Sequence, residues 1–474
     1  MDSQNSYPLQ RSTGYEISRD EMNVEHHERL ENSARRTRLE MFLTTSDRAL
    51  VLAGCALLQL PIWGFAMTYG IFQQYYIDNW SFDGSQSAVG VIGTTYNGVM
   101  YLSIPVFSMA FTRKWARYRR GAAIIGVFLS CISFIICSFS RNVWQLVLAQ
   151  GVLAALGGAL VYTPTTLSLG EHCSTENRAV AYGITLSCKN ITGTTCPFLM
   201  QALLSRLGFQ RTMWIWTGIV ATTSIAAVTV IPMTKSTNAD SPTLRHRKIP
   251  WDFLRHQTFY VYCIAIILQS SGYGIPQTYL NSYAHEVASI SVNASTLLIT
   301  LFNVPGIVSS TFFGWLSDNK FKNFSATATT FFSAISSAMA TFLLWGLAGS
   351  TSDSMSLLIL YSMIYGFFAG GYSATWGGVL KQMEAEAAEN NEAIDTGMVY
   401  GLLNGARGIG FVAGGVAGVQ LLKTGKAALA TEFGYETKYG PLILYTGLAT
   451  GFGGWSIAFH GKTLLRGLRM RLLG

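Results

Sequence analysis

The chain has 474 residues, of which 50% are hydrophobic and only 12% are charged. A soluble domain carries roughly 25% charged residues, so this composition argues against a soluble protein, a disordered chain, a collagen-like repeat and a coiled coil. The net charge of +8 does not indicate nucleic acid as a partner, because the basic residues lie in short loops beside apolar segments. The composition predicts a lipid bilayer as the surroundings of the chain.

Apolar segments recur from Ala49 onward, each near the ~20 residues that a helix needs to cross the hydrocarbon core. Lipid tolerates only helices or closed barrels, and unbroken apolar runs of this length favour helices. We therefore expect an all-α membrane protein with twelve membrane-spanning helices. Their expected ranges are 49–76, 86–112, 120–138, 144–168, 179–204, 211–232, 257–280, 294–316, 325–347, 356–380, 396–422 and 439–460.

Polar segments divide these spans into domains. Residues 1–48 are expected to be a cytoplasmic tail without a cleavable signal, and 233–256 a cytoplasmic linker between six-helix bundles at 49–232 and 257–460, with a tail at 461–474. Lysine and arginine are concentrated on the side that the N-terminus shares, so the positive-inside rule predicts that both termini are cytoplasmic. The acidic stretch from Glu384 to Asp395 is expected in a loop on that side.

The chain repeats itself, with each span resembling the span six positions later. The segments Tyr69–Tyr75 and Tyr273–Tyr279 agree at five of seven positions, and Asn97 corresponds to Asn303. Spans related in this way have the same orientation. Parallel repeats in transporters place the substrate site between the two halves near the membrane midplane.

Several short motifs carry a family resemblance. They are Trp63-Gly64 and Tyr69–Gln73 in the first span, Gln150-Gly151 and Gly157-Gly158 in the fourth, Tyr365–Gly371 in the tenth and Ala406–Gly410 in the eleventh. With these motifs the chain resembles the major facilitator superfamily, in particular its monocarboxylate transporter-like branch of fungal type. The resemblance implies two six-helix bundles related as parallel repeats, and alternating access between them.

The resemblance also implies gating residues. Gly314 and Asp318 fit the family's loop motif in the second half, and Arg113 belongs to its basic end in the first half. Ser108 and Thr112 stand where the first copy of that motif usually has Gly and Asp. Independently, Pro276 is expected to bend the seventh span, with gating as a secondary role.

Two cations are expected inside the membrane, Lys189 and Arg407, at equivalent positions in the fifth and eleventh spans. A charge at the bilayer centre costs at least ~3 kcal/mol, and the sequence places no acidic residue or histidine mid-span. Two such cations on opposite walls of one cavity predict an anionic ligand, since arginine binds carboxylates in bidentate fashion. The alternative is that each side chain snorkels or bonds to backbone carbonyls.

Other residues on the same helices are weaker candidates for substrate contacts, with helix packing as the alternative. They are Asn97, Asn303, Tyr69, Gln73, Tyr273, Gln277, Tyr372 and Trp376. Asn79 and Asn293 open two glycosylation sequons on the outer side, close to the membrane. The seven cysteines form no C-x-x-C pair, so neither a disulfide framework nor a metal site nor a cofactor is expected.

The leading hypothesis is a secondary transporter of a small organic anion, a monocarboxylate or carboxylated metabolite, that acts as a monomer in the plasma membrane. Proton coupling is left open, because the proton could travel on the substrate or on Lys189. The alternatives are an efflux transporter of a fungal secondary metabolite and a transporter-like nutrient sensor. An enzyme is not expected, because P-loop, hydrolase and zinc-protease motifs are missing in suitable contexts.

Overall fold

The computed structural model describes residues 47–79, 83, 89–112, 115–173, 178–232, 250–317, 325–350, 353–425 and 433–459. Most of the expected N-terminal tail, most of the linker and the C-terminal tail lie outside these residues. Arg113, Asp318 and the side chain of Asn293 also lie outside them.

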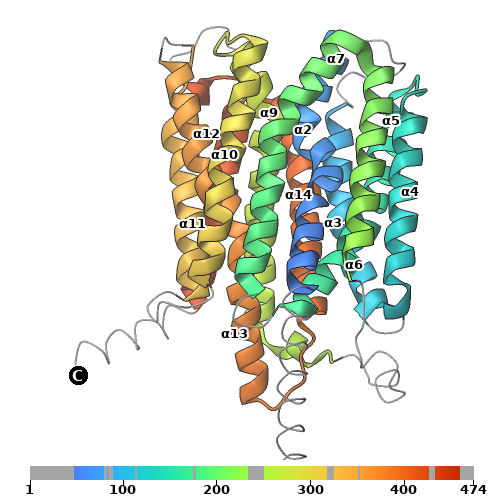
Figure 1. Cartoon of the computed structure of the whole chain (residues 1–474). Coiled ribbons are helices and arrows are strands. Elements are labelled where there is room, and N and C mark those ends of the chain that lie inside the picture. Colours follow the sequence, from blue (N-terminus) through green and yellow to red (C-terminus); the bar gives the residue numbers. More distant parts are fainter. Residues whose placement is uncertain are drawn as a thin grey trace, which may run out of the picture. The chain divides into compact units, whose positions relative to one another are not determined.

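The described elements are helices, shown in Figure 1, with one isolated bridge between Asp83 and Asn142. The main helices are α2 (Gln59–Asp78), α3 (Gly90–Thr112), α4 (Arg119–Cys137), α5 (Val143–Leu146), α6 (Ala154–His172), α7 (Arg178–Val230), α9 (Gln257–Glu286), α10 (Val292–Ser317), α11 (Ala326–Ala340), α12 (Ser354–Gly371), α13 (Trp376–Glu389), α14 (Thr396–Thr424) and α15 (Gly440–Phe452). Short 3-10 or π segments are η2 (Ala116–Tyr118), η3 (Val147–Leu153), η4 (Asp252–Arg255), η5 (Thr341–Trp345), η6 (Tyr372–Thr375) and η7 (Gly434–Glu436).

Ten helical segments of the described chain are long and apolar enough to cross a membrane. Several join consecutive elements, as in Val143–His172, which unites α5, η3 and α6. Large apolar side chains point outward from these helices, and Phe128 and Val308 are each 66% exposed. Such exposure would be unfavourable in water and is expected where helices face lipid.

The helix α7 runs through the ranges of the expected fifth and sixth spans, with one sharp turn between them. This helix is 53 residues long and contains a single residue outside the helical conformation, Gly208, with φ 76° and ψ 176°. A positive φ favours glycine, which has no Cβ to clash. Gly208 therefore turns the chain in one step, and α7 forms two arms that meet at a corner (Figure 1).

The helix α13 corrects one expectation. The tenth span was predicted to end at residue 380, but the helical path that begins at Ser354 continues to Glu389. Glu384 and Glu386 were expected in a loop and instead lie on α13. Glu384 pairs with Arg178 of α7 at 2.8 Å, and Glu386 accepts a hydrogen bond from Thr258 of α9 at 2.9 Å. These partners stabilise the helix beyond its apolar part.

The helix α14 packs between α3 and α9 through close backbone contacts. A Cβ atom at Gly414 would lie 2.0 Å from the carbonyl oxygen of Ser271 on α9, and one at Gly408 would lie 2.8 Å from the backbone nitrogen of Leu102 on α3. Only glycine permits such an approach. The helix that carries Arg407 is thereby held against helices from both halves of the chain.

Candidate functional site

Lys189 lies on the first arm of α7 and is only 7% exposed. Its Nζ atom lies 3.9 Å from the ring centroid of Trp63 on α2. It also donates a hydrogen bond of 3.4 Å to the hydroxyl of Tyr101 on α3. The face of an indole ring attracts a cation, more strongly where water is excluded, so this ring and the hydroxyl of Tyr101 partly compensate the burial of the ammonium group.

Arg407 lies on α14 and is 4% exposed. Its Cζ atom lies 5.2 Å from the ring of Tyr101, 5.4 Å from that of Tyr273, 5.6 Å from that of Trp376 and 5.5 Å from that of Phe411. Its Nε atom is buried without a hydrogen-bond partner in the described part of the chain. The guanidinium group is thus surrounded by rings, which supply weak attraction and no formal negative charge.

The two cations meet at Tyr101, which contacts both of them. Its ring lies 5.2 Å from that of Trp63 and stacks on that of Phe411 at 5.5 Å with an angle of 5°. We call Trp63, Tyr101, Tyr273, Trp376 and Phe411 the aromatic cage.

The cage encloses a positive charge that no described acidic residue neutralises. Among the described residues, no ion pair includes Lys189 or Arg407. Electrostatic interactions are strengthened where the surroundings are apolar, and an unpaired buried charge is unfavourable. The arrangement is chemically suited to bind an anion between the two cations.

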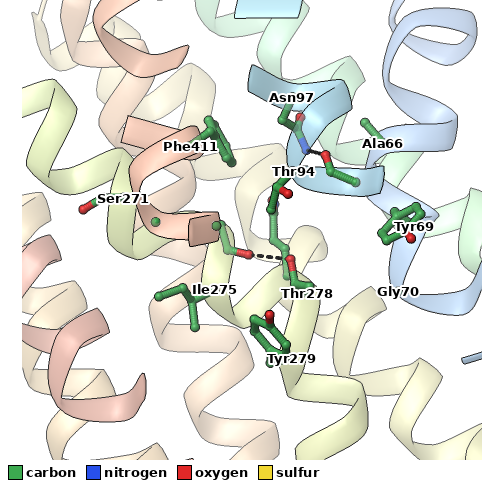
Figure 2. A pocket seen from close by; sticks show the side chains of 15 residues that line it. Ala66, Tyr69, Gly70, Thr94, Asn97, Ser271, Ile275, Thr278, Tyr279 and Phe411 are labelled. Carbon is green, nitrogen blue, oxygen red and sulfur yellow. Dashed lines mark hydrogen bonds between the residues drawn. The ribbon is translucent and has the colours of Figure 1, made fainter. Parts of the chain in front are cut away.

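A pocket adjoins the cage between α2, α3, α9 and α14 (Figure 2). Its lining is uncharged and includes Tyr69, Asn97, Gln277 and Phe411. In this conformation the pocket has room for little more than a water molecule. Phe411 belongs to the pocket and also contacts Arg407, so this ring links the pocket to the cations.

The structure brings some of the predicted site residues together and leaves others apart. Tyr273 and Trp376 join Arg407 in the cage, whereas Tyr69, Asn97 and Gln277 line the adjoining pocket. The Nδ2 atom of Asn97 already donates to the carbonyl of Gly93 in its own helix, at 3.1 Å (Figure 2).

Three further candidates are buried between helices, and two of them make hydrogen bonds to backbone carbonyls. The Nδ2 atom of Asn303 donates to the carbonyl of Gly193 on α7 at 3.2 Å, and Tyr372 donates to the carbonyl of Gly453 at 2.9 Å. Gln73 is buried, and its Oε1 atom has no partner among the described residues. These positions suit helix packing, which was the alternative expected for them.

The described residues that were predicted to act in gating or to be glycosylated lie outside the aromatic cage. A Cβ atom at Gly314 would lie 2.7 Å from the carbonyl oxygen of Ala179, where α10 meets α7. Pro276 lies inside α9. Asn79 follows the last residue of α2, is exposed, and donates to the carbonyl of Tyr75 at 3.2 Å.

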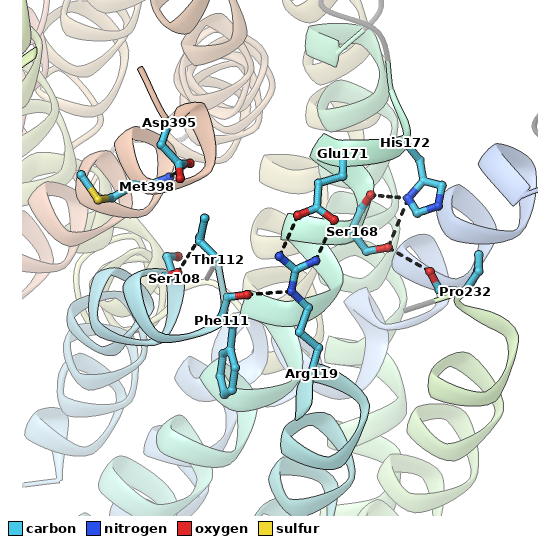
Figure 3. Close-up of polar contacts among 10 residues, drawn as sticks. All are labelled: Ser108, Phe111, Thr112, Arg119, Ser168, Glu171, His172, Pro232, Asp395 and Met398. Atoms are coloured by element: carbon cyan, nitrogen blue, oxygen red, sulfur yellow. Dashed lines mark hydrogen bonds and ion pairs between the residues drawn. The ribbon is translucent and has the colours of Figure 1, made fainter. Parts of the chain in front are cut away.

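Two ion pairs near the helix ends were not predicted, because their arginines were used only to orient the chain in the membrane. Arg119 is 1% exposed and donates through both Nη atoms to Glu171 at 2.7 Å, and through Nε to the carbonyl of Phe111 at 2.9 Å (Figure 3). Arg178 connects α7 to Glu384 of α13 and also donates to Thr396 at 3.2 Å. The second pair joins the two halves of the chain.

Sequence reasoning did not assign Trp63, Tyr101 or Phe411 to the site. A usable signal existed for two of them, because Tyr101 follows Asn97 and Phe411 follows Arg407 by four residues. Residues four apart lie on the same face of a helix. An aromatic residue at that spacing from each candidate polar residue would have pointed to the cage.

Comparisons with known proteins agree with this architecture. A family model described as Major Facilitator Superfamily matches residues 50–415. The chain is 27% identical over 313 residues to an MFS-type transporter of Gibberella moniliformis, covering 64% of this chain and 70% of that protein. It is 23% identical over 354 residues to Monocarboxylate transporter 12 of Mus musculus, covering 68% of this chain and 70% of that protein. It is 26% identical over 409 residues to the Aspyridones efflux protein of Emericella nidulans, covering 84% of this chain and 76% of that protein.

Proposed function

Because the chain belongs to the major facilitator superfamily and is an integral multi-pass membrane transporter, we propose that it carries a small organic anion by alternating access. The substrate class is a monocarboxylate or a carboxylated metabolite. The observation that carries this proposal is the pair of buried cations, Lys189 and Arg407, which both contact Tyr101, the first at its hydroxyl and the second at its ring.

The chemistry of this pair favours a carboxylate. A guanidinium group offers two parallel donors that match the two oxygens of a carboxylate, and an ammonium group adds a point charge beside them. An anion held there would neutralise charge that the described residues leave uncompensated. The rings of the aromatic cage would contact the apolar part of the same molecule.

We infer twelve spans in two six-helix bundles. Ten segments meet the criteria of length and composition, and the corner at Gly208 divides one of them into arms at 178–207 and 209–230. The helix α3 adds a further span, because its 23 residues carry no charged side chain and extend over about 35 Å. Lys189 then belongs to the first bundle and Arg407 to the second, as a site between parallel repeats requires.

The charge distribution supports an orientation with both termini in the cytoplasm. The corner at Gly208 then lies on the outer side, and the pair of Arg178 and Glu384 lies on the cytoplasmic side. We place the transporter in the plasma membrane, where it acts as a monomer.

Efflux of a secondary metabolite is the second candidate function. Two observations favour it: the large aromatic surface around Arg407 and the likeness to a protein named for the efflux of aspyridones. An acidic metabolite would use the same two cations, and a neutral one would not need them.

The experiment that tests the proposal is uptake of radiolabelled carboxylates into proteoliposomes. Arg407→Gln should lower saturable uptake about 30-fold or more, since losing one member of a buried charged contact costs roughly 2–5 kcal/mol. Lys189→Gln should act in the same direction. The matched control is Arg255→Gln, which removes an arginine whose side chain is 81% exposed and should leave uptake within twofold of wild type.

Full uptake of every transported carboxylate by Arg407→Gln would refute the anion site. If well-folded wild-type protein carries no small acid, the organic-anion proposal fails and the efflux candidate remains. A pH gradient imposed across the same liposomes then decides whether any observed flux is coupled to protons.

A further inference from the structure

We infer that the chain has a second binding site, separate from the aromatic cage, which takes a neutral molecule carrying a hydroxyl or N–H group on an apolar frame. The site is a hollow of about 360 Å³ between α2, α7, α9 and α10, next to the corner at Gly208. This volume lies within the ~300–1,000 Å³ that is usual for small-molecule sites.

The lining of the hollow selects against ions. None of its ten lining residues is acidic, basic or a histidine. Apolar surface is contributed by Ile71 and Leu204, and side-chain amides by Gln74, Asn79, Gln201 and Asn281. An ion placed there would lose its hydration without gaining an opposite charge, so the hollow differs in chemistry from the cationic cage.

Asn281 shows which hydrogen-bonding group the ligand would supply. This residue of α9 is 3% exposed, and its Oδ1 atom is buried without a hydrogen-bond partner among the described residues. An amide oxygen only accepts hydrogen bonds, and leaving a buried acceptor unpaired is unfavourable. A ligand that donates from a hydroxyl or an N–H group would satisfy it, whereas a ligand with acceptors alone would not.

The position of the hollow implies an effect on transport. Its walls come from α2 and α7 in the first half of the chain and from α9 and α10 in the second half. A molecule that contacts both halves stabilises the arrangement in which they are observed, because it binds that arrangement better than any other. Occupancy should therefore slow the exchange between conformations. This consequence depends on the proposed transport function, but the binding itself does not.

Binding is tested with the purified full chain in lipid nanodiscs, using N-benzylacetamide and N-benzyl-N-methylacetamide as probes. The two differ by the N–H donor. We expect the first to raise the Tm of the protein, with an affinity about fivefold to tenfold higher than that of the second, as one hydrogen bond provides. In Asn281→Leu the two probes should become equal.

The matched control is Asn404→Leu, which replaces another buried asparagine, one whose Nδ2 atom donates within its own helix at 2.8 Å. It should preserve the difference between the probes. Ser205→Trp gives a second route, because Ser205 is an exposed lining residue and an indole there should block the hollow and abolish binding. If Asn281→Leu does not fold, Ser205→Trp decides the question alone.

The proposal is overturned if wild-type protein binds neither probe or binds both equally, or if Ser205→Trp binds N-benzylacetamide like wild type. In proteoliposomes N-benzylacetamide should lower the maximal rate of carboxylate uptake without changing its KM. Binding that depends on Asn281 in a protein without carboxylate flux would retain this site and reject the proposed substrate. Carboxylate flux in a protein that does not bind N-benzylacetamide would retain the proposed substrate and reject this second site.

Discussion

Removing the carboxylate of Glu171 should destabilise the protein by about 2–4 kcal/mol. In the described structure, Glu171 accepts hydrogen bonds from both Nη atoms of Arg119, a guanidinium that is 1% exposed (Figure 3). After Glu171→Ala, the contact that remains is the one from Nε to the carbonyl of Phe111. An uncompensated buried charge costs roughly 3–5 kcal/mol, and we lower this range because the side chain of Glu171 is 44% exposed, so water replaces part of its contact.

Two comparisons isolate the cause. Asp252→Ala removes the partner of Arg255 in a pair separated by 3.8 Å with side chains 81% and 46% exposed, and it should cost less than ~0.5 kcal/mol. Arg119→Met in the Glu171→Ala background should restore more than half of the lost stability, because an apolar side chain of similar length has no charge to leave unpaired.

The assay is equilibrium unfolding in mixed dodecyl maltoside and SDS micelles, followed by the fluorescence of the 11 tryptophans. The reasoning is refuted if Glu171→Ala lies within 0.5 kcal/mol of wild type, a margin that is about that of an exposed pair. It is also refuted if Arg119→Met makes the Glu171→Ala protein less stable still.

Two other predictions concern contacts between helices. Arg178→Gln removes the 2.8 Å contact with Glu384, so it should raise the population in which α7 and α13 are separated about 10-fold, equal to ~1.4 kcal/mol. Spin-label distances between the two helices measure this population, and reversing both charges should restore the wild-type distribution. An unchanged distribution in Arg178→Gln would show that the ion pair does not hold the two helices together. Gly414→Ala should destabilise the protein by about 1–3 kcal/mol, because the added Cβ would meet a carbonyl oxygen. In the control Gly218→Ala no atom lies near the added Cβ, so this variant should be stabilised by about 0.5–1 kcal/mol. Equal free energies of unfolding for the two variants would contradict the close packing described at Gly414.

The parts of the fold that depend on local sequence could be predicted. Apolar runs of about twenty residues placed the helices, and the motifs around Trp63 and Arg407 identified the superfamily and the monocarboxylate transporter-like branch, which the comparisons confirm. Lys189 and Arg407 were selected because charges are rare in such runs. The structure places both beside Tyr101, and their role in transport stays a prediction.

The parts that depend on distant contacts could not be predicted. The extension of α13 depends on partners for Glu384 and Glu386 that come from α7 and α9. The aromatic cage was predicted only in part. Tyr273 and Trp376 were among the candidates, whereas Trp63, Tyr101 and Phe411 were not, because 13% of the residues are aromatic and most aromatic residues pack elsewhere in the core.

The contact between α3 and α14 has a consequence for how the chain is made. Leu102 and Gly408, which meet in this contact, are separated by about 300 residues, so at ~5–20 residues per second the ribosome needs roughly 15–60 s to deliver the second helix after the first. Throughout that interval the surface of α3 that packs on α14 in the folded protein lacks this native partner. A ribosome that stalls before Thr396 therefore releases a chain in which this surface of α3 is never covered by α14.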